Sequence, residues 1–512
     1  MRLRHLATAT ALVLAAASAG TVWALHTEGS PEETAEMFLT AWGRQDYPAM
    51  RALTVEPPDD FERWYRRFRT DLKLTGAAFS VLGDARDGEP ATVGFRATLE
   101  GPVNWAYEGS LRLVEHERTW RVEWSPAAVH PRLGTGLRIK TMLVKAERAP
   151  ILAADGTRID TPATQGSVQQ LVEGLTQTYA SRLTGTSSAR IDLVKGTEKV
   201  ATLATATATA GRELRTTIDL DVHRAAASAL EAVNRPASLV ALRPSTGEIL
   251  AVANKPGGFN RALLGHYPPG STFKVITTSA LVADGMTADE RVSCPAEQNI
   301  GGFAFHNAGF KDYGTLPLRT AFAHSCNTTF GALTVDRLGG RRLAAVAGSF
   351  GFGAPVRPGV PAVRAEFPAP KDDTDLASAS IGQGRVLASP LNMATVAAAI
   401  ADGSWRPPRL VAASLLPEAE PRKLEPEILR ALRTLMPAVV VEGTASAVPF
   451  PSGTAGKTGT AEFGSGKEPP SHAWFIGYRG DLAFSIVVEG GGAGSTVAAP
   501  IASRFLTGLP QR

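Results

Sequence analysis

The chain opens with an apolar run, residues 6–25, that contains no charged side chain. A helix of twenty residues rises roughly 30 Å, which is the thickness of the hydrocarbon core of a bilayer. Arg2 and Arg4 precede the run, and basic residues there keep that end of a segment in the cytoplasm. The pattern predicts a membrane anchor within residues 1–25, with the rest of the chain outside the membrane. A cleaved signal peptide is the alternative, because the small residues at 17–19 could form its cleavage site.

Residues 31–145 change from helical to extended periodicity. Apolar residues recur at the helical spacing i, i+3, i+4 and i+7 over residues 32–42. Two later segments, 93–99 and 120–124, alternate apolar and polar residues, which predicts half-buried antiparallel strands. We therefore expect a small α+β domain with helices first and a meander after them. Its aromatic residues are expected in the core rather than in a binding site.

Residues 146–212 follow a less regular pattern. Residues 201–210 are almost entirely Ala and Thr, which supply little apolar volume for a core. The segment is predicted to be a connecting module or stalk and not a reaction centre.

From residue 213 onward, the alternation of helices and strands predicts an antiparallel sheet covered by helices. The turn sequence Pro244-Ser245-Thr246-Gly247 lies between two apolar runs and indicates a hairpin. The predicted segments are helices at 221–233 and 391–401 and strands at 238–242, 248–253, 473–478 and 483–488.

Composition narrows the classes of function. The chain has 512 residues, 44% apolar and 20% charged, enough for about three domains with real cores. Its net charge is +4 and no basic stripe is visible, so nothing favours nucleic acid as a partner. The two cysteines, Cys294 and Cys326, exclude a disulfide-rich scaffold and a Cys-ligated metal site. A disulfide between them and two free thiols both stay open, since exported proteins can form such a bond.

Three short polar motifs suggest chemistry, and the first is Ser271-Thr272-Phe273-Lys274. Positions i and i+3 are neighbours on one face of a helix, so Lys274 can lie beside the Ser271 hydroxyl. A lysine whose pKa is lowered by burial or nearby cations can take the proton of that hydroxyl and create a nucleophile. Ser-x-x-Lys arises by chance about twice in a chain of this length, so an exposed helical lysine is the alternative.

The second motif is Ser325-Cys326-Asn327. On a turn, both polar side chains can face one cavity. Ser325 could then relay a proton to a leaving group, and the Asn327 amide could hold a peptide carbonyl. A simple turn or a helix cap would explain the same residues. A bond from Cys326 to Cys294 would tether this wall of the cavity.

The third motif is Lys457-Thr458-Gly459-Thr460. In an extended segment, Thr458 and Thr460 share one face. Gly459 removes a side chain, which would let a substrate lie against the backbone. Lys-Thr-Gly is expected by chance in about one of ten such chains, and a turn with an exposed lysine is the alternative.

In this order, the three motifs resemble the active-site signature of penicillin-binding proteins and serine β-lactamases. Residues 120–131 resemble the NTF2-like N-terminal domain of the methicillin-resistance penicillin-binding protein. Residues 148–156 resemble the start of the pedestal, or dimerisation, module. The resemblance to the transpeptidase domain covers about residues 213–508 and includes Gly382-Gln383-Gly384, Ser389-Pro390-Leu391, Glu442-Gly443-Thr444-Ala445 and residues 472–478.

The resemblance implies a class B penicillin-binding protein, a D,D-transpeptidase that cross-links peptidoglycan. The implied fold class is multidomain α+β, with a β-lactamase-like transpeptidase domain whose antiparallel sheet is covered by helices. The implied domains are an anchor or signal peptide at 1–25, an NTF2-like domain at 31–145, a pedestal or dimerisation module at 146–212 and the transpeptidase domain at 213–512.

Four residues receive catalytic roles from the resemblance. Ser271 would be the acylated nucleophile and Lys274 its base. Ser325 and Lys457 would form the proton-relay side of the cavity.

The remaining implied residues bind substrate. Asn327 would orient the donor peptide, and the Thr458-Gly459-Thr460 segment would hold the carboxylate of D-Ala or of a β-lactam. The backbone N–H groups of Ser271 and Thr460 would form the oxyanion hole. No metal or organic cofactor is expected.

The implied partners are D-Ala-D-Ala stem peptides, β-lactam antibiotics, the membrane through the N-terminal segment, and other wall-synthesis proteins. The catalytic domain is expected outside the cytoplasm at the cell membrane, or secreted if the N-terminal segment is cleaved. A serine β-lactamase is the nearest alternative, but we find no counterpart of the class A Glu or the class C Tyr-x-Asn pattern, and Asn327 stands where class D enzymes usually have an apolar residue. A non-catalytic scaffold or a β-lactam sensor is the other alternative. The intact Ser271, Lys274 and Lys457 disfavour it.

Overall fold

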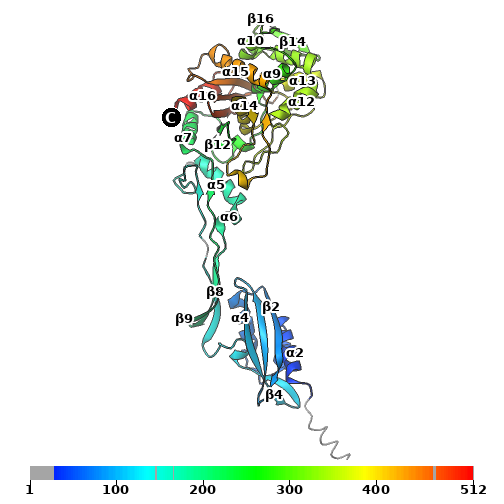
Figure 1. Ribbon diagram of the computed structural model, residues 1–512, viewed down its shortest axis with the longest axis vertical. Helices are drawn as coiled ribbons and strands as arrows, with labels where there is room; N and C mark the ends of the chain where they lie inside the picture. The colour runs from blue at the N-terminus through cyan, green and yellow to red at the C-terminus, as the bar shows by residue number, and fades with distance from the viewer. Residues whose placement is uncertain (1–27, 145–146, 165, 465–468, 511–512) are drawn as a thin grey trace, which may run out of the picture. The chain divides into compact units, whose positions relative to one another are not determined.

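The structure of the protein is a computed structural model that describes residues 28–144, 147–164, 166–464 and 469–510 (Figure 1). The predicted anchor or signal peptide at 1–25 lies outside these residues. Within them, no helix is both long enough and apolar enough to cross a bilayer. The chain divides into two compact units. The N-terminal unit contains Met1–Arg148 and Thr184–Gly211, and the C-terminal unit contains Ala149–Leu183 and Arg212–Arg512.

The N-terminal unit is an α+β fold with two sheets. The larger sheet has the order β1-β5-β4-β3-β2, in which β2 to β5 form an antiparallel meander and β1 pairs in parallel with β5. The smaller sheet has the order β6-β8-β9. The elements are α2 (Pro31–Gly43), α3 (Tyr47–Ala52), β1 (Thr54–Val55), α4 (Phe61–Leu72), β2 (Gly76–Arg86), β3 (Ala91–Glu100), β4 (Trp105–His116), β5 (Thr119–Glu123), η1 (Pro126–Ala128), β6 (Leu137–Val144), β8 (Ser188–Lys195) and β9 (Glu198–Ala206).

The start of the first helix follows from a capping box. The Ser30 hydroxyl accepts the N–H of Glu33, and the Glu33 carboxylate accepts the N–H of Ser30, each at 3.2 Å. The apolar face of α2 then buries Trp42, whose ring stacks on Phe79 with centroids 4.0 Å apart. The predicted helix at 32–42 and the predicted strands within β3 and β5 are confirmed.

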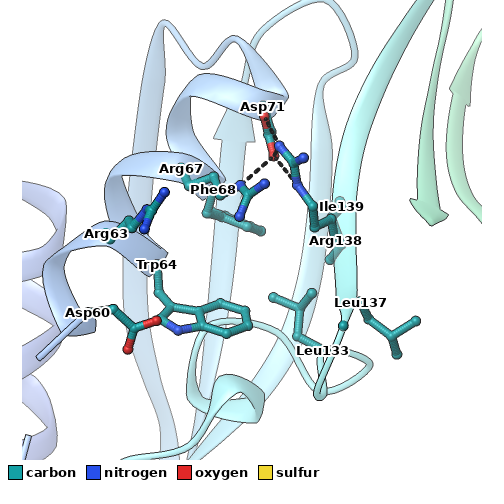
Figure 2. A pocket seen from close by; sticks show the side chains of 11 residues that line it. Asp60, Arg63, Trp64, Arg67, Phe68, Asp71, Leu133, Leu137, Arg138 and Ile139 are labelled. Carbon is teal, nitrogen blue, oxygen red and sulfur yellow. Dashed lines mark hydrogen bonds and ion pairs between the residues drawn. The ribbon is translucent and has the colours of Figure 1, made fainter. Parts of the chain in front are cut away.

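A cavity of about 270 Å³ lies between α4 and the segment that leads into β6 (Figure 2). Trp64 and Phe68 line it from α4, and Leu137 lines it from β6. At its upper rim in the figure, Arg138 forms a two-pronged ion pair with Asp71, at a shortest distance of 2.6 Å. Its lining contains no hydroxyl, thiol or imidazole, so none of these side chains can act as Ser271 is predicted to act.

The predicted stalk at 146–212 does not form a compact unit of its own. Residues 149–183 belong to the C-terminal unit and residues 184–211 to the N-terminal unit. The Ala- and Thr-rich stretch contributes to β9, where Ala201 and Leu203 pack against the N-terminal core. The pedestal or dimerisation role stays a prediction.

The C-terminal unit is built on a five-stranded antiparallel sheet with the order β12-β11-β21-β20-β19. Its strands are β7 (Ile151–Leu152), β10 (Leu214–Arg215), β11 (Ala237–Arg243), β12 (Glu248–Lys255), β13 (Arg291–Cys294), β14 (Glu297–Ile300), β15 (Phe303–His306), β16 (Gly314–Pro317), β17 (Ser404–Trp405), β18 (Arg422–Lys423), β19 (Ala455–Glu462), β20 (Ser471–Arg479) and β21 (Leu482–Val488).

Helices surround this sheet in the upper part of Figure 1. They are α5 (Gly166–Thr178), α6 (Ala180–Thr184), α7 (Leu220–Leu230), α8 (Arg261–Leu264), η2 (Gly270–Phe273), α9 (Lys274–Ala283), η3 (Ala308–Phe310), α10 (Leu318–Ala323), α11 (Asn327–Leu333), η4 (Thr334–Leu338), α12 (Gly339–Ser349), α13 (Asp373–Ser380), α14 (Pro390–Asp402), η5 (Ala413–Leu415), α15 (Pro426–Val441) and α16 (Ala498–Thr507).

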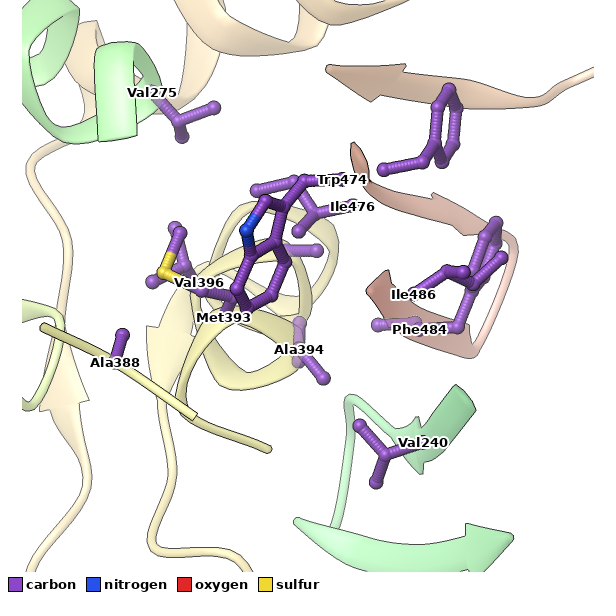
Figure 3. Packing of buried hydrophobic residues seen from close by; sticks show 14 of the residues in the cluster. Val240, Val275, Ala388, Met393, Ala394, Val396, Trp474, Ile476, Phe484 and Ile486 are labelled. Carbon is purple, nitrogen blue, oxygen red and sulfur yellow. The ribbon is translucent and has the colours of Figure 1, made fainter. Parts of the chain in front are cut away.

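The central strands are mostly apolar because both faces of the sheet are covered. Trp474 on β20 lies beside Met393 of α14 (Figure 3). Phe484 on β21 contacts Phe505 of α16, with ring centroids 5.4 Å apart. A strand that is buried on both faces contains a continuous run of apolar residues and not an alternation of apolar and polar residues. The predicted helices and strands of this region are confirmed, and their packing leaves β19 as the strand at one edge of the sheet.

Candidate active site

The predicted nucleophile lies on a tight turn just before a helix. Ser271 belongs to the short helix η2. The α-helix α9 does not begin at this serine but three residues later, at Lys274. Gly270 adopts a left-handed φ of +54°, and a Cβ there would lie 2.5 Å from Thr460 O. Glycine therefore lets the turn approach β19 closely.

Lys274 is completely buried beneath the turn. Its Nζ donates to Ser271 Oγ at 3.1 Å, to Ser325 O at 2.7 Å and to Asn327 Oδ1 at 2.6 Å. Burial, followed by the charge of Lys457, holds the pKa of Lys274 well below its ordinary value of 10.5. A lysine with such a pKa can be neutral and can accept a proton from the hydroxyl beside it.

Lys457 is equally buried and lies on β19. Its Nζ donates to Ser325 Oγ at 2.9 Å and to Thr458 O at 3.1 Å. Burial lowers the pKa of Lys457 to about 7. The Ser325 hydroxyl lies 3.3 Å from Lys274 Nζ as well, so it joins the two amines.

The second motif is held in an uncommon conformation. Ser325 has a left-handed φ of +62°, which is rare for a residue with a Cβ. The next residue, Cys326, is disulfide-bonded to Cys294. This pairing settles the alternative that the sequence left open, and no free cysteine remains in the chain.

Asn327 is the first residue of α11, and its amide is fixed on both sides. Its Oδ1 accepts from Lys274, and its Nδ2 donates to His306 O at 3.0 Å. An amide nitrogen carries two N–H groups. The second one has no partner within the described part of the chain, so it can donate to the carbonyl of a ligand.

The third motif lies on the edge strand β19. The Thr458 hydroxyl is 2.6 Å from the hydroxyl of Thr444. The Thr460 side chain is exposed, and its hydroxyl accepts from the N–H of Gly494 at 3.3 Å. Both hydroxyls belong to the strand edge beside Ser271, so they can meet a carboxylate there.

The structure gives a packing reason for a glycine at position 459. A Cβ at this position would lie 2.9 Å from Thr272 Cγ2 and 3.0 Å from Pro269 O. The missing side chain therefore makes room for the turn that carries Ser271. The interpretation that it also lets a substrate lie against the backbone stays a prediction.

Direct hydrogen bonds thus join Ser271, Lys274, Ser325, Asn327 and Lys457 into one cluster. The three motifs lie far apart in the chain, and the sequence predicted that they meet at one place. This cluster is that place. The catalytic and binding roles of these residues stay predictions.

The structure adds residues that no motif contained. Thr444 and Gln383 lie in stretches that resemble the transpeptidase family, outside the three motifs. Gln383 Nε2 donates to Thr460 O at 3.5 Å. Asn307, which contacts the second motif, has no signal in the sequence, because a single Asn in a loop resembles any turn residue.

Known families and proteins match most of the chain. Residues 237–507 match the family described as penicillin binding protein transpeptidase domain. Residues 30–136 match the family described as NTF2-like N-terminal transpeptidase domain. These matches confirm the family that the sequence motifs indicated and the predicted fold class.

Two curated relatives are named peptidoglycan D,D-transpeptidase PbpA. The one from Mycobacterium tuberculosis H37Rv is 34% identical over an alignment of 325 residues, and the match covers 52% of this chain and 65% of the relative. The one from Mycolicibacterium smegmatis is 34% identical over an alignment of 359 residues, and the match covers 57% of this chain and 71% of the relative. The match thus spans less than two thirds of the length of the M. tuberculosis protein.

A solved structure has the same fold. The penicillin G acyl-enzyme complex of penicillin-binding protein A from M. tuberculosis superposes with a TM-score of 0.60 at 26% identity. The superposition covers 72% of this chain and 100% of the other.

Proposed function

The chain belongs to the penicillin-binding protein transpeptidase family, and on that premise we propose that it is a D,D-transpeptidase that cross-links peptidoglycan stem peptides through an acyl-enzyme at Ser271. The observation that carries the proposal is the 3.1 Å approach of Lys274 Nζ to Ser271 Oγ in a buried cluster. A hydroxyl beside a lysine of lowered pKa is the arrangement that serine acyl transfer requires.

Acylation begins with the loss of a proton from Ser271 to neutral Lys274. The Ser271 oxygen attacks the carbonyl carbon of the penultimate D-Ala, and negative charge develops on the carbonyl oxygen. The backbone N–H groups of Ser271 and Thr460 are the proposed donors to that oxygen. The peptide C–N bond then breaks and an ester forms at Ser271. The released D-Ala amine takes, through Ser325, the proton that Lys274 received from Ser271.

The donor peptide lies along the edge strand β19 in this proposal, because an edge strand can add an extended peptide as a further strand. The hydroxyls of Thr458 and Thr460 bind the terminal carboxylate, and Lys457 supplies favourable charge. Asn327 donates its second amide N–H to a carbonyl of the peptide. Gly459 contributes only through its backbone.

The second half of the reaction transfers the acyl group. An amine from a neighbouring stem peptide attacks the ester carbon, and it gives one proton to neutral Lys274 as the new amide bond forms. The Ser271 oxygen leaves and recovers a proton from Lys274. A β-lactam acylates the same oxygen, and its opened ring stays attached, so acceptor amines cannot regenerate the enzyme.

We also propose the domain arrangement and the location that the sequence predicted. Residues 1–25 would anchor the chain in the cell membrane with the catalytic domain outside the cytoplasm. Residues 146–212 would connect an NTF2-like domain at 31–145 to the transpeptidase domain at 213–512. The uncross-linked strands must come from a glycan-polymerising reaction, so proteins of wall synthesis are the proposed partners.

Intact-mass analysis after incubation with a penicillin tests the proposal. We expect one adduct per chain, mapped to Ser271 and persistent for hours, and we expect Ser271→Ala to prevent it. Ser349→Ala removes a hydroxyl whose one hydrogen bond within the described residues is to Ala345 O, and it should leave the adduct unchanged. An adduct that disappears within seconds would indicate a β-lactamase, and the lack of any adduct would contradict acyl transfer at this serine.

A further inference from the structure

Asn307 is a buried polar residue that contacts the active-site wall from outside the three motifs. Its side chain is 2% exposed. Its Nδ2 donates to Pro295 O at 2.8 Å and to Lys311 O at 3.0 Å, and it lies 3.3 Å from Cys294 Sγ. Every polar atom of this amide is therefore engaged, because its Oδ1 accepts from α11 as well.

The contact with α11 replaces an N-cap. The first N–H groups of a helix have no partner within it. Cys326 stands at the cap position and makes no capping bond with its side chain. Asn307 Oδ1 accepts the N–H of Asn327 at 2.8 Å and that of Thr328 at 3.3 Å instead. A residue 20 positions earlier in the chain thus fixes where α11 begins.

The disulfide holds the same segment from a second side. Cys326 lies between Ser325 and Asn327, and its bond to Cys294 ties it to β13. Asn307 contacts Cys294 Sγ, so both anchors meet at one place. The two anchors restrain the residues on either side of Cys326.

Such restraint matters because Ser325 is in a costly conformation. A left-handed φ on a residue with a Cβ costs about 1–2 kcal/mol and persists only where the surroundings determine it. The Ser325 hydroxyl must also remain within reach of both Lys274 and Lys457. A small rotation of the segment would break the path between the two amines.

We propose that Asn307 and the Cys294–Cys326 disulfide form a clamp that positions Ser325 and Asn327 for acyl transfer. The clamp deepens the proposed function, since it acts on the same site. Its members are positioning residues, because they do not touch the Ser271 hydroxyl and act through Ser325 and Asn327.

Two variants remove the clamp in different ways. Asn307→Leu removes the cap at nearly constant volume, and the double variant Cys294→Ser with Cys326→Ser removes the covalent link. Asn254→Leu is the matched control. Asn254 is also a buried Asn, and its amide contacts Asn260 and Ala262, outside the motifs.

The first readout is acylation of the full chain by a fluorescent penicillin, followed as a rate constant and as the final labelled fraction. A displacement of about 1 Å in a catalytic group can cost about 10²-fold in rate. We expect both clamp variants to lose 10- to 100-fold, as an order of magnitude, in the rate constant while nearly every chain is finally labelled. Asn254→Leu should keep the wild-type rate constant. A wild-type rate constant with a reduced labelled fraction in either clamp variant would overturn the proposal, because only folding would then be affected.

The second readout does not depend on acylation. Hydrogen exchange of the Asn327 and Thr328 amides should become faster in Asn307→Leu and should not change in Asn254→Leu. Unchanged protection in Asn307→Leu overturns the clamp. If the wild-type chain is not labelled by penicillin at all, the proposed function fails, and this exchange measurement still decides whether the clamp exists.

Discussion

The Ser325 hydroxyl accepts a hydrogen bond from Lys457 Nζ at 2.9 Å, although the two residues are 132 positions apart in the chain. The same hydroxyl lies 3.3 Å from Lys274 Nζ. Two buried amines around one hydroxyl repel each other when both are charged, and this repulsion helps to lower the pKa of Lys274. The arrangement therefore favours a proton that moves between the amines through Ser325.

Ser325→Ala should interrupt that path. Lys274 would still reach Ser271, so acylation should continue, but the leaving amine would lose its proton donor. Proton transfer by a positioned group contributes about 10²–10⁴-fold, and we expect a loss of at least about 10²-fold in the acylation rate constant. Stopped-flow measurement with a chromogenic cephalosporin would give this constant, and a loss of less than threefold would argue against the relay.

Lys457→Met should change how stability depends on pH. The pKa of Lys457 is about 7 in the folded protein, against an ordinary value of 10.5. Between these values the unfolded chain holds a proton that the folded chain lacks. The unfavourable contribution of Lys457 to the free energy of unfolding therefore shrinks as pH rises. Below pH 7 both states are protonated and the contribution is constant.

The expected result is that wild-type protein gains stability over Lys457→Met between pH 7 and pH 9, at most about 1.4 kcal/mol per pH unit. Thermal midpoints of both proteins across pH 6 to 9 test this, because pH effects from groups that do not interact with Lys457 cancel in the difference. A difference that does not vary with pH would show that Lys457 stays protonated in the folded state.

Gly459→Ala should push β19 away from the turn that carries Ser271, since the added methyl would lie 2.9 Å from Thr272 Cγ2. Overpacking of this kind costs about 1–3 kcal/mol, and we expect the acylation rate to fall with the stability. Gly348→Ala is the control, because a Cβ there meets no atom within 4 Å in α12. It should be neutral or slightly stabilising, and equal effects of the two variants would contradict the packing argument.

Thr444→Val should weaken capture of the carboxylate. The substitution removes the Thr444 hydroxyl, which lies 2.6 Å from Thr458 Oγ1 and orients the Thr458 hydroxyl. The loss of one hydrogen bond is worth about 1 kcal/mol, or about fivefold in affinity. We expect the concentration for half-maximal acylation to rise about fivefold while the limiting rate changes little. Thr496→Val, whose hydroxyl contacts only Ala493 O, should match the wild type, and a lower limiting rate in Thr444→Val would assign Thr444 a different role.

Much of this organisation could be predicted because it depends on local periodicity. Apolar runs identified the strands around Trp474 and Phe484, and the i, i+3 spacing placed Lys274 under Ser271. The remainder depends on contacts between distant segments. Alternation along β19 cannot say which neighbour Gly459 faces, and nothing near Asn307 in sequence points to a helix that begins 20 residues later.

The bond between Cys294 and Cys326 also has a consequence for when activity can appear. Thiol-reducing systems of the cytosol keep cysteines reduced, so that disulfides do not persist there. A newly synthesised chain still inside the cell would therefore hold both residues as thiols, with its second motif incompletely restrained. Under the proposed function and location, maturation of the catalytic centre would then be coupled to export, and precursors that terminate in D-Ala-D-Ala would not be cross-linked before they leave the cytosol.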